Sequence, residues 1–152
     1  IVVGDVGVGK TSAVLEHLKV LPNTHMYTRI TMHKYADSAY LQAKMHESLV
    51  KKAGKVVGPP GTRRAVFFID DLNMPDPDER GVRSAAALLL QRITYGIWYE
   101  REELTRNEVV NVQFTAASRP SYGAHSLDPR LMRHFTIIGC CPPDEGELVG
   151  IF

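Results

Sequence analysis

The chain has 152 residues, the usual size of a single domain and long enough to bury a sizeable core. Eighteen basic and 17 acidic residues leave a formal net charge of +1, so the composition predicts neither nucleic acid nor an anionic membrane as a partner. No apolar run approaches the roughly 20 residues that a bilayer-spanning helix needs. The chain starts inside an apolar run, and we therefore expect the natural chain to extend further toward the N-terminus.

A phosphate-binding loop is predicted at the start of the chain. Ile1–Val3 is a β-branched run typical of a buried strand, Gly4–Thr11 matches G-x-x-x-x-G-K-[ST], and Ser12–Val20 has apolar residues at helical spacing. Glycines bring backbone N–H groups close to phosphate, a helix N-terminus favours negative charge, Lys10 reaches the β- and γ-phosphates, and Thr11 binds Mg²⁺. The alternative, a glycine-rich turn that matches by chance, is disfavoured by the strand–loop–helix context. The predicted nucleotide-binding residues are Gly4, Asp5, Val6, Gly7, Val8, Gly9, Lys10, Thr11 and Ser12.

Further along the chain, the patterns predict strand, helix, loop, strand, helix, insertion, strand and strand. These segments are Met26–Met32, Ala36–Lys52, the Gly/Pro-rich basic loop Lys51–Arg64, Ala65–Ile69, Arg83–Tyr95, the irregular or hairpin insertion Gly96–Arg106, Val109–Ala116 and Phe135–Cys141. Strands that alternate with helices predict an α/β fold with a largely parallel sheet. A nucleotide is then expected beyond the carboxyl ends of the strands.

Two short patterns are not expected to bind a ligand. GPPGT at Gly58–Thr62 looks like part of a phosphate loop, but Arg63 and Arg64 replace the Gly-Lys pair and a strand follows, so we predict a surface turn. Cys140 and Cys141 are adjacent and lack metal-ligand spacing. We predict that they are small buried strand residues in a reducing compartment.

Two carboxylates end the most apolar predicted strand, in the stretch AVFFIDDLN. Asp70 is expected to hold the magnesium ion together with Thr11, and Asp71 stands where a glutamate commonly activates or orients the attacking water. The alternative is a solvated turn, because the sequence Asp-Asp-Leu-Asn-Met-Pro is also typical of turns. That alternative does not explain why the turn follows a phosphate loop in the same domain.

Polar residues in the last third of the chain are further candidates. Ser118 follows the predicted strand Val109–Ala116 and is either a polar sensor of the γ-phosphate or a turn serine. Arg130 and Arg133, in LDPRLMRHF, are three residues apart and would share a helix face. They either stabilise a neighbour's phosphates in trans or form local ion pairs.

Four stretches, GDVGVGKT, FFIDDLNMP, the run from GIWYEREEL to VVNVQFTAASRP, and LDPRLMRHF, together resemble an AAA+ module of a dynein heavy chain. The resemblance is greatest to the third module of the motor ring in the axonemal type, and it covers nearly all 152 residues. Its most specific parts are the DDLNMP run and the Trp98-Tyr99 insertion ahead of VQF. The phosphate loop alone is shared by many P-loop families.

The resemblance implies that all 152 residues form one P-loop NTPase fold, the large α/β subdomain of an AAA+ module. Its parallel five-stranded sheet would have the order 5-1-4-3-2 and be sandwiched by helices. ATP or ADP with Mg²⁺ would bind between one module and the next in a six-module ring. Gly4–Thr11 matches the Walker A loop, Asp70 the Walker B metal residue, and Ser118 the sensor I position, where asparagine is usual. Arg133, rather than Arg130, matches the arginine finger, which would serve the preceding module.

Two departures from the family pattern limit what the resemblance implies. Asp71 replaces the usual glutamate, and its carboxylate reaches about an ångström less far, which can cost ~10²-fold in rate. We therefore expect slow hydrolysis and a regulatory site. The chain stops at Phe152, so we expect the helical lid that carries sensor II, and the segment that helps hold adenine, to lie outside it.

The predicted function is an ATP-binding and slowly hydrolysing module that regulates a microtubule-based motor of the ciliary or flagellar axoneme, in the cytoplasm and on the cytoskeleton. Its partners would be neighbouring modules of the same heavy chain, and the microtubule through distant parts of that chain. One alternative is a structural module that holds nucleotide without hydrolysing it, and another is an unrelated AAA+ remodelling ATPase. The predicted catalytic residues are Lys10, Asp71, Ser118 and Arg133.

Overall fold

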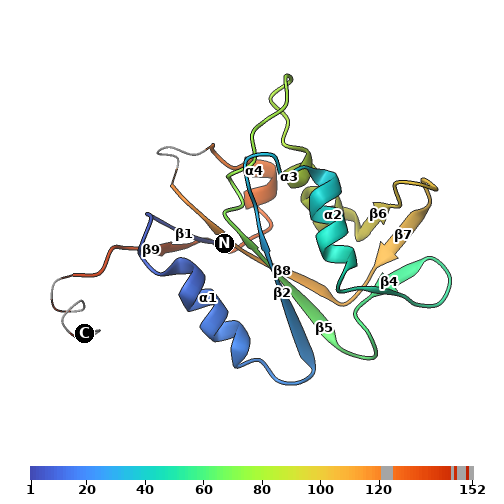
Figure 1. The fold of residues 1–152 in the computed structure, drawn as a ribbon, viewed down its shortest axis with the longest axis horizontal. Coiled ribbons are helices and arrows are strands. Elements are labelled where there is room, and N and C mark those ends of the chain that lie inside the picture. Colours follow the sequence, from blue (N-terminus) through green and yellow to red (C-terminus); the bar gives the residue numbers. More distant parts are fainter. Residues whose placement is uncertain (121–124, 145, 147–149, 151–152) are drawn as a thin grey trace.

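The computed structural model describes residues 1–120, 125–144, 146 and 150. Helices and strands alternate along most of the chain (Figure 1). In chain order the elements are β1 (Val2–Gly4), α1 (Lys10–Lys19), β2 (His25–Thr31), α2 (Ser38–His46), β3 (Val50–Lys51), β4 (Val56–Gly58), β5 (Arg64–Asp70), α3 (Ser84–Tyr95), β6 (Ile97–Tyr99), β7 (Arg106–Val109), β8 (Val112–Ser118), α4 (Pro129–Met132) and β9 (Ile138–Cys140). No helix in these described ranges is both long enough and apolar enough to cross a bilayer.

The main sheet has five parallel strands in the order β2-β5-β8-β1-β9. Numbering these five strands by their order in the chain and reading from β9 gives 5-1-4-3-2, so the predicted topology is confirmed. β8 therefore separates β1 from β5, and the segments that follow these three strands leave the sheet at the same edge. The sheet thus places the glycine loop and the aspartate pair on either side of one strand.

Apolar residues on both faces of β5 explain why helices cover both sides of the sheet. Phe67 and Ile69 belong to the larger core cluster, which includes Leu41 of α2 and Leu89 of α3. Val66 and Phe68 alternate with them and pack in a smaller cluster with Leu18 of α1. Figure 1 shows α1 on one side of the sheet and α2 and α3 on the other, as the prediction of a sandwiched sheet requires.

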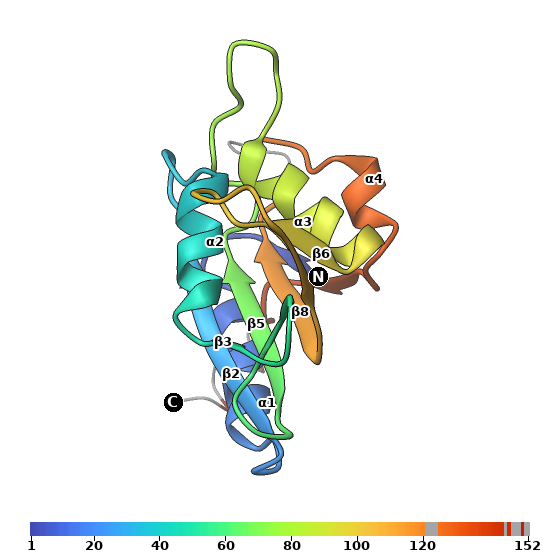
Figure 2. The ribbon, with the colours of Figure 1, turned by 90° about the vertical axis from the view of Figure 1, so that its right-hand side faces the viewer.

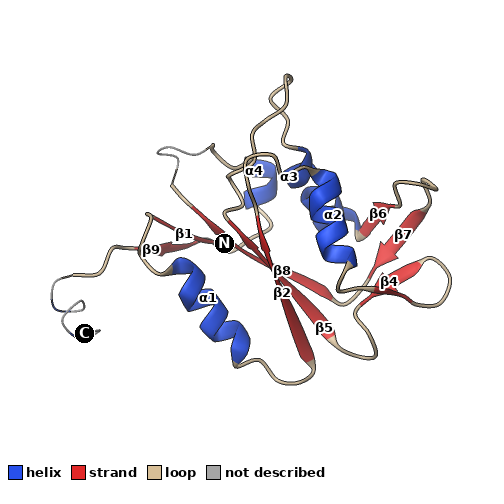
Figure 3. Cartoon of the chain, viewed as in Figure 1, coloured by secondary structure: helices blue, strands red, loops and turns tan. Residues whose placement is uncertain are grey.

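A second, four-stranded sheet in the order β3-β4-β7-β6 was only partly predicted. The hairpin insertion is confirmed as β6 and β7, and β6 lies beside α3 (Figure 2; Figure 3). Trp98, in β6, is fully buried. The predicted helix over 36–52 is wrong beyond His46, because Val50 and Lys51 pair with the end of β4 instead. The predicted loop over 51–64 likewise contains β4, which pairs in parallel with β7. Strands of two or three residues carry too little periodicity to be recognised without their partners.

Several boundaries also differ from the prediction. Val109 belongs to β7 rather than β8, because Asn111 adopts a left-handed conformation with φ of 56° and separates the two strands. The last strand is shorter than predicted, and it lies at the edge of the sheet. Cys140 is only half-buried there and Cys141 is exposed beyond its end, so the prediction that both thiols are buried is wrong.

Gly4 is expected to be needed for the pairing of β1 with β9. A Cβ at this position would lie 2.6 Å from the carbonyl oxygen of Cys140, which is backbone and cannot move aside cheaply. Gly4→Ala should therefore lower the free energy of unfolding by about 1–3 kcal/mol, as overpacking commonly does. Gly139→Ala is the matched control, because a Cβ there would meet nothing within 4 Å. Equal denaturation midpoints for the two variants would contradict this account.

Candidate nucleotide-binding site

The loop between β1 and α1 has the backbone of an anion-binding loop. Gly7 and Gly9 have φ of +85° and +81°, a left-handed region that other residues rarely adopt. Gly9 is also the N-cap of α1, and no side chain caps the helix. The first N–H groups of a helix have no partner within it, and they carry the positive end of its dipole. The start of α1 is thus suited to bind a negative group, as the motif predicts.

Lys10 lies inside this loop rather than in solvent. It is the first residue of α1, only 9% of it is exposed, and its Nζ donates a hydrogen bond of 2.6 Å to the carbonyl oxygen of Asp5. An ammonium group has three hydrogens, so this bond leaves two for phosphate oxygens. Asp5 and the 74% exposed Val6 form the outer part of the loop, and Ser12 is exposed at the start of α1.

The contact between Thr11 and Asp70 joins the loop to the end of β5. The Thr11 hydroxyl lies 3.1 Å from both carboxylate oxygens of Asp70, although 59 positions separate the two residues in the chain. Asp70 is the last residue of β5 and is almost fully buried. The structure therefore brings together the two residues predicted to hold a metal ion. A hydroxyl and a carboxylate are hard oxygen donors of the kind that Mg²⁺ prefers, so this pair fits the predicted ion.

Arg29 also binds Asp70 and was missed by the sequence analysis. Its Nη2 lies 2.7 Å from Oδ2 of Asp70, and the two form an ion pair. Arg29 belongs to β2, where Thr31 is in register with Asp70. Side chains two positions apart on a strand point to the same face, so Arg29 could have been found once this register was known.

Asp71 has an unusual backbone and a cationic partner. Its φ is 55°, a left-handed value that is uncommon for residues other than glycine. One carboxylate oxygen lies 3.6 Å from Nε of Arg119, which follows β8 and was also missed by the sequence analysis. The carboxylate thus faces the segment that leaves the neighbouring strand.

Asn73 ties the loop after β5 to the segment after β8. It is 2% exposed, and its Nδ2 donates to the carbonyl oxygens of Arg119 and His125 at 3.1 and 3.3 Å. Its Oδ1 accepts from the backbone N–H of Arg119 at 3.3 Å. Ser118 is buried beside this link, in register with Val3 of β1, and its hydroxyl donates to the carbonyl oxygen of Arg119. The predicted sensor therefore lies next to the glycine loop, although its role stays a prediction.

A third link joins the loops after β2, β5 and β8. His125 lies 3.2 Å from Asp76, and Lys34 forms an ion pair with the other oxygen of that carboxylate. The hydrogen bond with His125, helped by the charge of Lys34, holds the pKa of the Asp76 carboxyl below its ordinary value. All three groups are exposed to solvent, so this link contributes mainly to loop position.

The two C-terminal arginines are not brought to this cluster. Arg130 is an exposed residue of α4, a helix of four residues. Arg133 follows it as the C-cap, is also exposed, and has its Nε 3.4 Å from Nε2 of His134. Among the described contacts, neither side chain touches Lys10 or Asp70. This position is compatible with a role toward another module, which stays a prediction.

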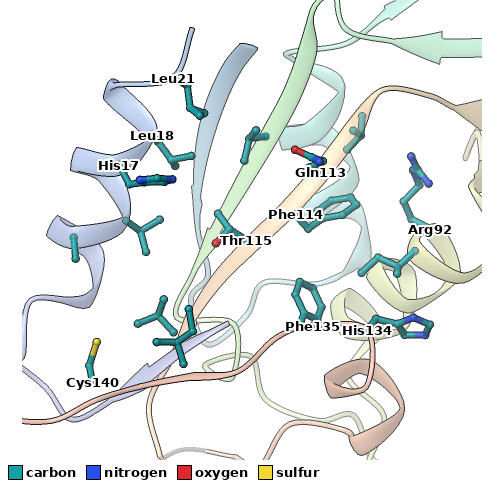
Figure 4. A pocket seen from close by; sticks show the side chains of 17 residues that line it. His17, Leu18, Leu21, Arg92, Gln113, Phe114, Thr115, His134, Phe135 and Cys140 are labelled. Atoms are coloured by element: carbon teal, nitrogen blue, oxygen red, sulfur yellow. The ribbon is translucent and has the colours of Figure 1, made fainter. Parts of the chain in front are cut away.

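A cavity of about 810 Å³ lies apart from the predicted site. Figure 4 shows His17 and Leu18 of α1 on one side of it, Phe114 of β8 behind, and Arg92 and Phe135 on the other side. Burial lowers the pKa of the Arg92 guanidinium, which donates a hydrogen bond of 2.7 Å to the carbonyl oxygen of Val109. The cavity is lined by neither Thr11 nor Asp70, so we do not identify it with the nucleotide site.

Comparison with known proteins gives one consistent family. A sequence model described as the P-loop containing dynein motor region matches residues 1–143. The chain is 36% identical over 151 residues to "Dynein axonemal heavy chain 9" from Homo sapiens, and 39% identical over 150 residues to "Dynein axonemal heavy chain 11" from Sus scrofa. It is 35% identical over 150 residues to "Dynein beta chain, ciliary" from Tripneustes gratilla.

Each of these three alignments covers 99% of this chain but only 3% of the relative. The similarity therefore spans the whole glycine loop, the aspartate pair and the sheet that joins them. The chain belongs to the family of P-loop-containing dynein motor regions.

Proposed function

We propose that this chain is an ATP-binding and slowly hydrolysing AAA+ module of an axonemal dynein heavy chain, and that it corresponds to the third module of the motor ring. The contact between Thr11 and Asp70 carries this proposal, because it joins a phosphate-binding loop to a buried carboxylate. The names of the relatives, which include axonemal, ciliary and flagellar chains, support the assignment to the axoneme.

Different groups at the site bind the phosphates of ATP and the magnesium ion. Backbone N–H groups at the start of α1, together with Lys10, hold the phosphates, because they offer several donors and positive charge at one place. Thr11 and Asp70 hold Mg²⁺. When bound, the ion supplies positive charge that offsets the charge on the phosphate oxygens.

Asp71 orients the attacking water and accepts its proton, and Arg119 keeps the carboxylate facing the end of β8. Ser118 lies at the adjacent strand end and senses the terminal phosphate. Arg133, on the exposed end of α4, reaches the nucleotide of the preceding module, where a trans arginine stabilises transition-state charge. Neighbouring modules of the same chain are therefore the direct partners, and the microtubule is engaged by distant parts of that chain.

The second candidate is a module that holds nucleotide without hydrolysing it. The ion pair between Asp71 and Arg119 favours this candidate, because it engages the carboxylate that would otherwise act on water. In either case the nucleotide regulates the motor only through different affinities for two states of the ring.

Lys10→Ala in the full heavy chain is expected to weaken nucleotide binding at this module by roughly 10- to 100-fold, since hydrogen bonds to charged groups are lost. Photo-crosslinking with azido-ATP, followed by assignment of each labelled peptide of the heavy chain to its module, measures occupancy of this module separately from the others. Lys19→Ala is the control, because Lys19 lies on the same helix but pairs with Glu16 at the surface. Equal labelling of the two variants would refute nucleotide binding through this loop.

Asp71→Asn separates the two candidate functions. Asparagine has nearly the same shape and tolerates the left-handed backbone, so the loop should keep its structure. If Asp71 acts on water, single-turnover hydrolysis at this module should fall by about 10²-fold or more. The measurement is the ratio of ATP to ADP retained on crosslinked peptides over time. A ratio that does not differ between wild type and variant would favour the non-hydrolysing candidate.

A further inference from the structure

The carboxylate of Asp70 is shared between two partners from different elements. The hydroxyl of Thr11 lies 3.1 Å from each of its oxygens, and Nη2 of Arg29 lies 2.7 Å from Oδ2. Only 5% of the Asp70 side chain is exposed, so its negative charge needs a compensating group. The described residues place no other cationic group in ion-pair distance of it.

The guanidinium and a magnesium ion would compete for the same oxygens. The guanidinium carries a full positive charge, so it remains a competitor for the carboxylate unless it moves away. A cation that stays in place also repels a divalent ion held by the same carboxylate. Binding of magnesium therefore requires Arg29 to give up at least part of its contact with Asp70.

The position of Arg29 allows this displacement. It lies on β2, which is an edge strand of the main sheet, and 43% of its side chain is exposed. Its guanidinium can thus move toward solvent without opening the core. Asp70 cannot follow, because it ends β5, an interior strand of the sheet, and its carbonyl oxygen accepts from the N–H of Met32.

We propose that Arg29 is an internal counter-ion that occupies Asp70 in the metal-free site and raises the magnesium concentration that this module needs. The proposal rests on the proposed nucleotide-binding function and adds a regulation of the same site. With both Lys10 and Arg29 in place, the site carries the positive charge that suits a nucleotide without its metal. Arg29 is thus a positioning residue for Asp70, and it sets how strongly the metal contributes to nucleotide retention.

The test measures local hydrogen exchange in the full heavy chain, in peptides that cover residues 25–31 and 64–72. Magnesium is titrated at saturating ADP for wild type, Arg29→Gln and Arg29→Lys. The magnesium midpoint is the Mg²⁺ concentration that gives half of the full change in exchange. For Arg29→Gln we expect this midpoint to fall by about tenfold or more, because a competing unit charge near a divalent ion is removed. Arg29→Lys keeps the charge and should stay close to wild type.

Arg64→Gln is the matched control, because it makes the same charge change at the exposed, opposite end of β5. An unchanged midpoint in Arg29→Gln, or an equal fall in Arg64→Gln, would overturn the proposal. In Arg29→Gln, ADP could also protect the peptides less against hydrogen exchange in EDTA while the magnesium midpoint stays unchanged. That result would overturn the proposal too, because it would make Arg29 a phosphate ligand.

Failure of the proposed function has a different signature, namely no effect of ADP on wild-type peptides at any magnesium concentration. The proposal about Arg29 is then decided by the same exchange measurement made without nucleotide. If residues 64–72 exchange hydrogen faster in Arg29→Gln than in wild type in EDTA, and Mg²⁺ alone reverses this difference, the proposal is supported. The absence of that reversal would overturn it.

Discussion

The contact between Thr11 and Asp70 is the constraint on which the site depends. It forms because β1 and β5 flank the same strand, β8, and all three end at one edge of the sheet. The topology alone brings the start of α1 within hydrogen-bond distance of a carboxylate 59 positions away. Alternation of apolar residues along β5 determines the face of the sheet to which that carboxylate points, since Phe67 and Ile69 must face α2 and α3. A slip of one residue would turn Asp70 away from the loop.

Around this contact, the segments that follow the strands hold one another. Asn73 fixes the backbone after β5 to the backbone after β8, and Arg119 faces Asp71 from the same segment. The ion pairs of Asp76 add the loop after β2. Groups that would recognise the terminal phosphate are therefore mechanically linked to those that would hold the metal. Such a link is what a regulatory nucleotide site needs in order to report its occupancy.

The sequence was sufficient to predict the glycine loop, the five main strands and their order. The apolar run that ends at Asp70 and the complete loop motif are local signals, and the resemblance supplied the strand order. Arg29, Arg119 and Asn73 were missed because their importance arises from register and loop packing, which connect residues far apart in the chain. The second sheet was missed in part for the same reason, since β3 pairs with β4 and β4 pairs with β7, which lies far along the chain. Cys141 was misplaced because an apolar pattern does not distinguish an edge strand from a central one.

The left-handed backbone at Asp71 links the length of this side chain to the shape of the turn. Aspartate and asparagine adopt that conformation more readily than glutamate does, because their short polar side chains can bond to the nearby backbone. A longer acid would reach further from the backbone but would fit this turn less well. The shorter acid and the turn geometry are therefore matched, and a sequence that gained glutamate here would also need a different path for the chain leaving β5. On this view the slow chemistry expected of the module originates in its main chain as much as in one missing methylene.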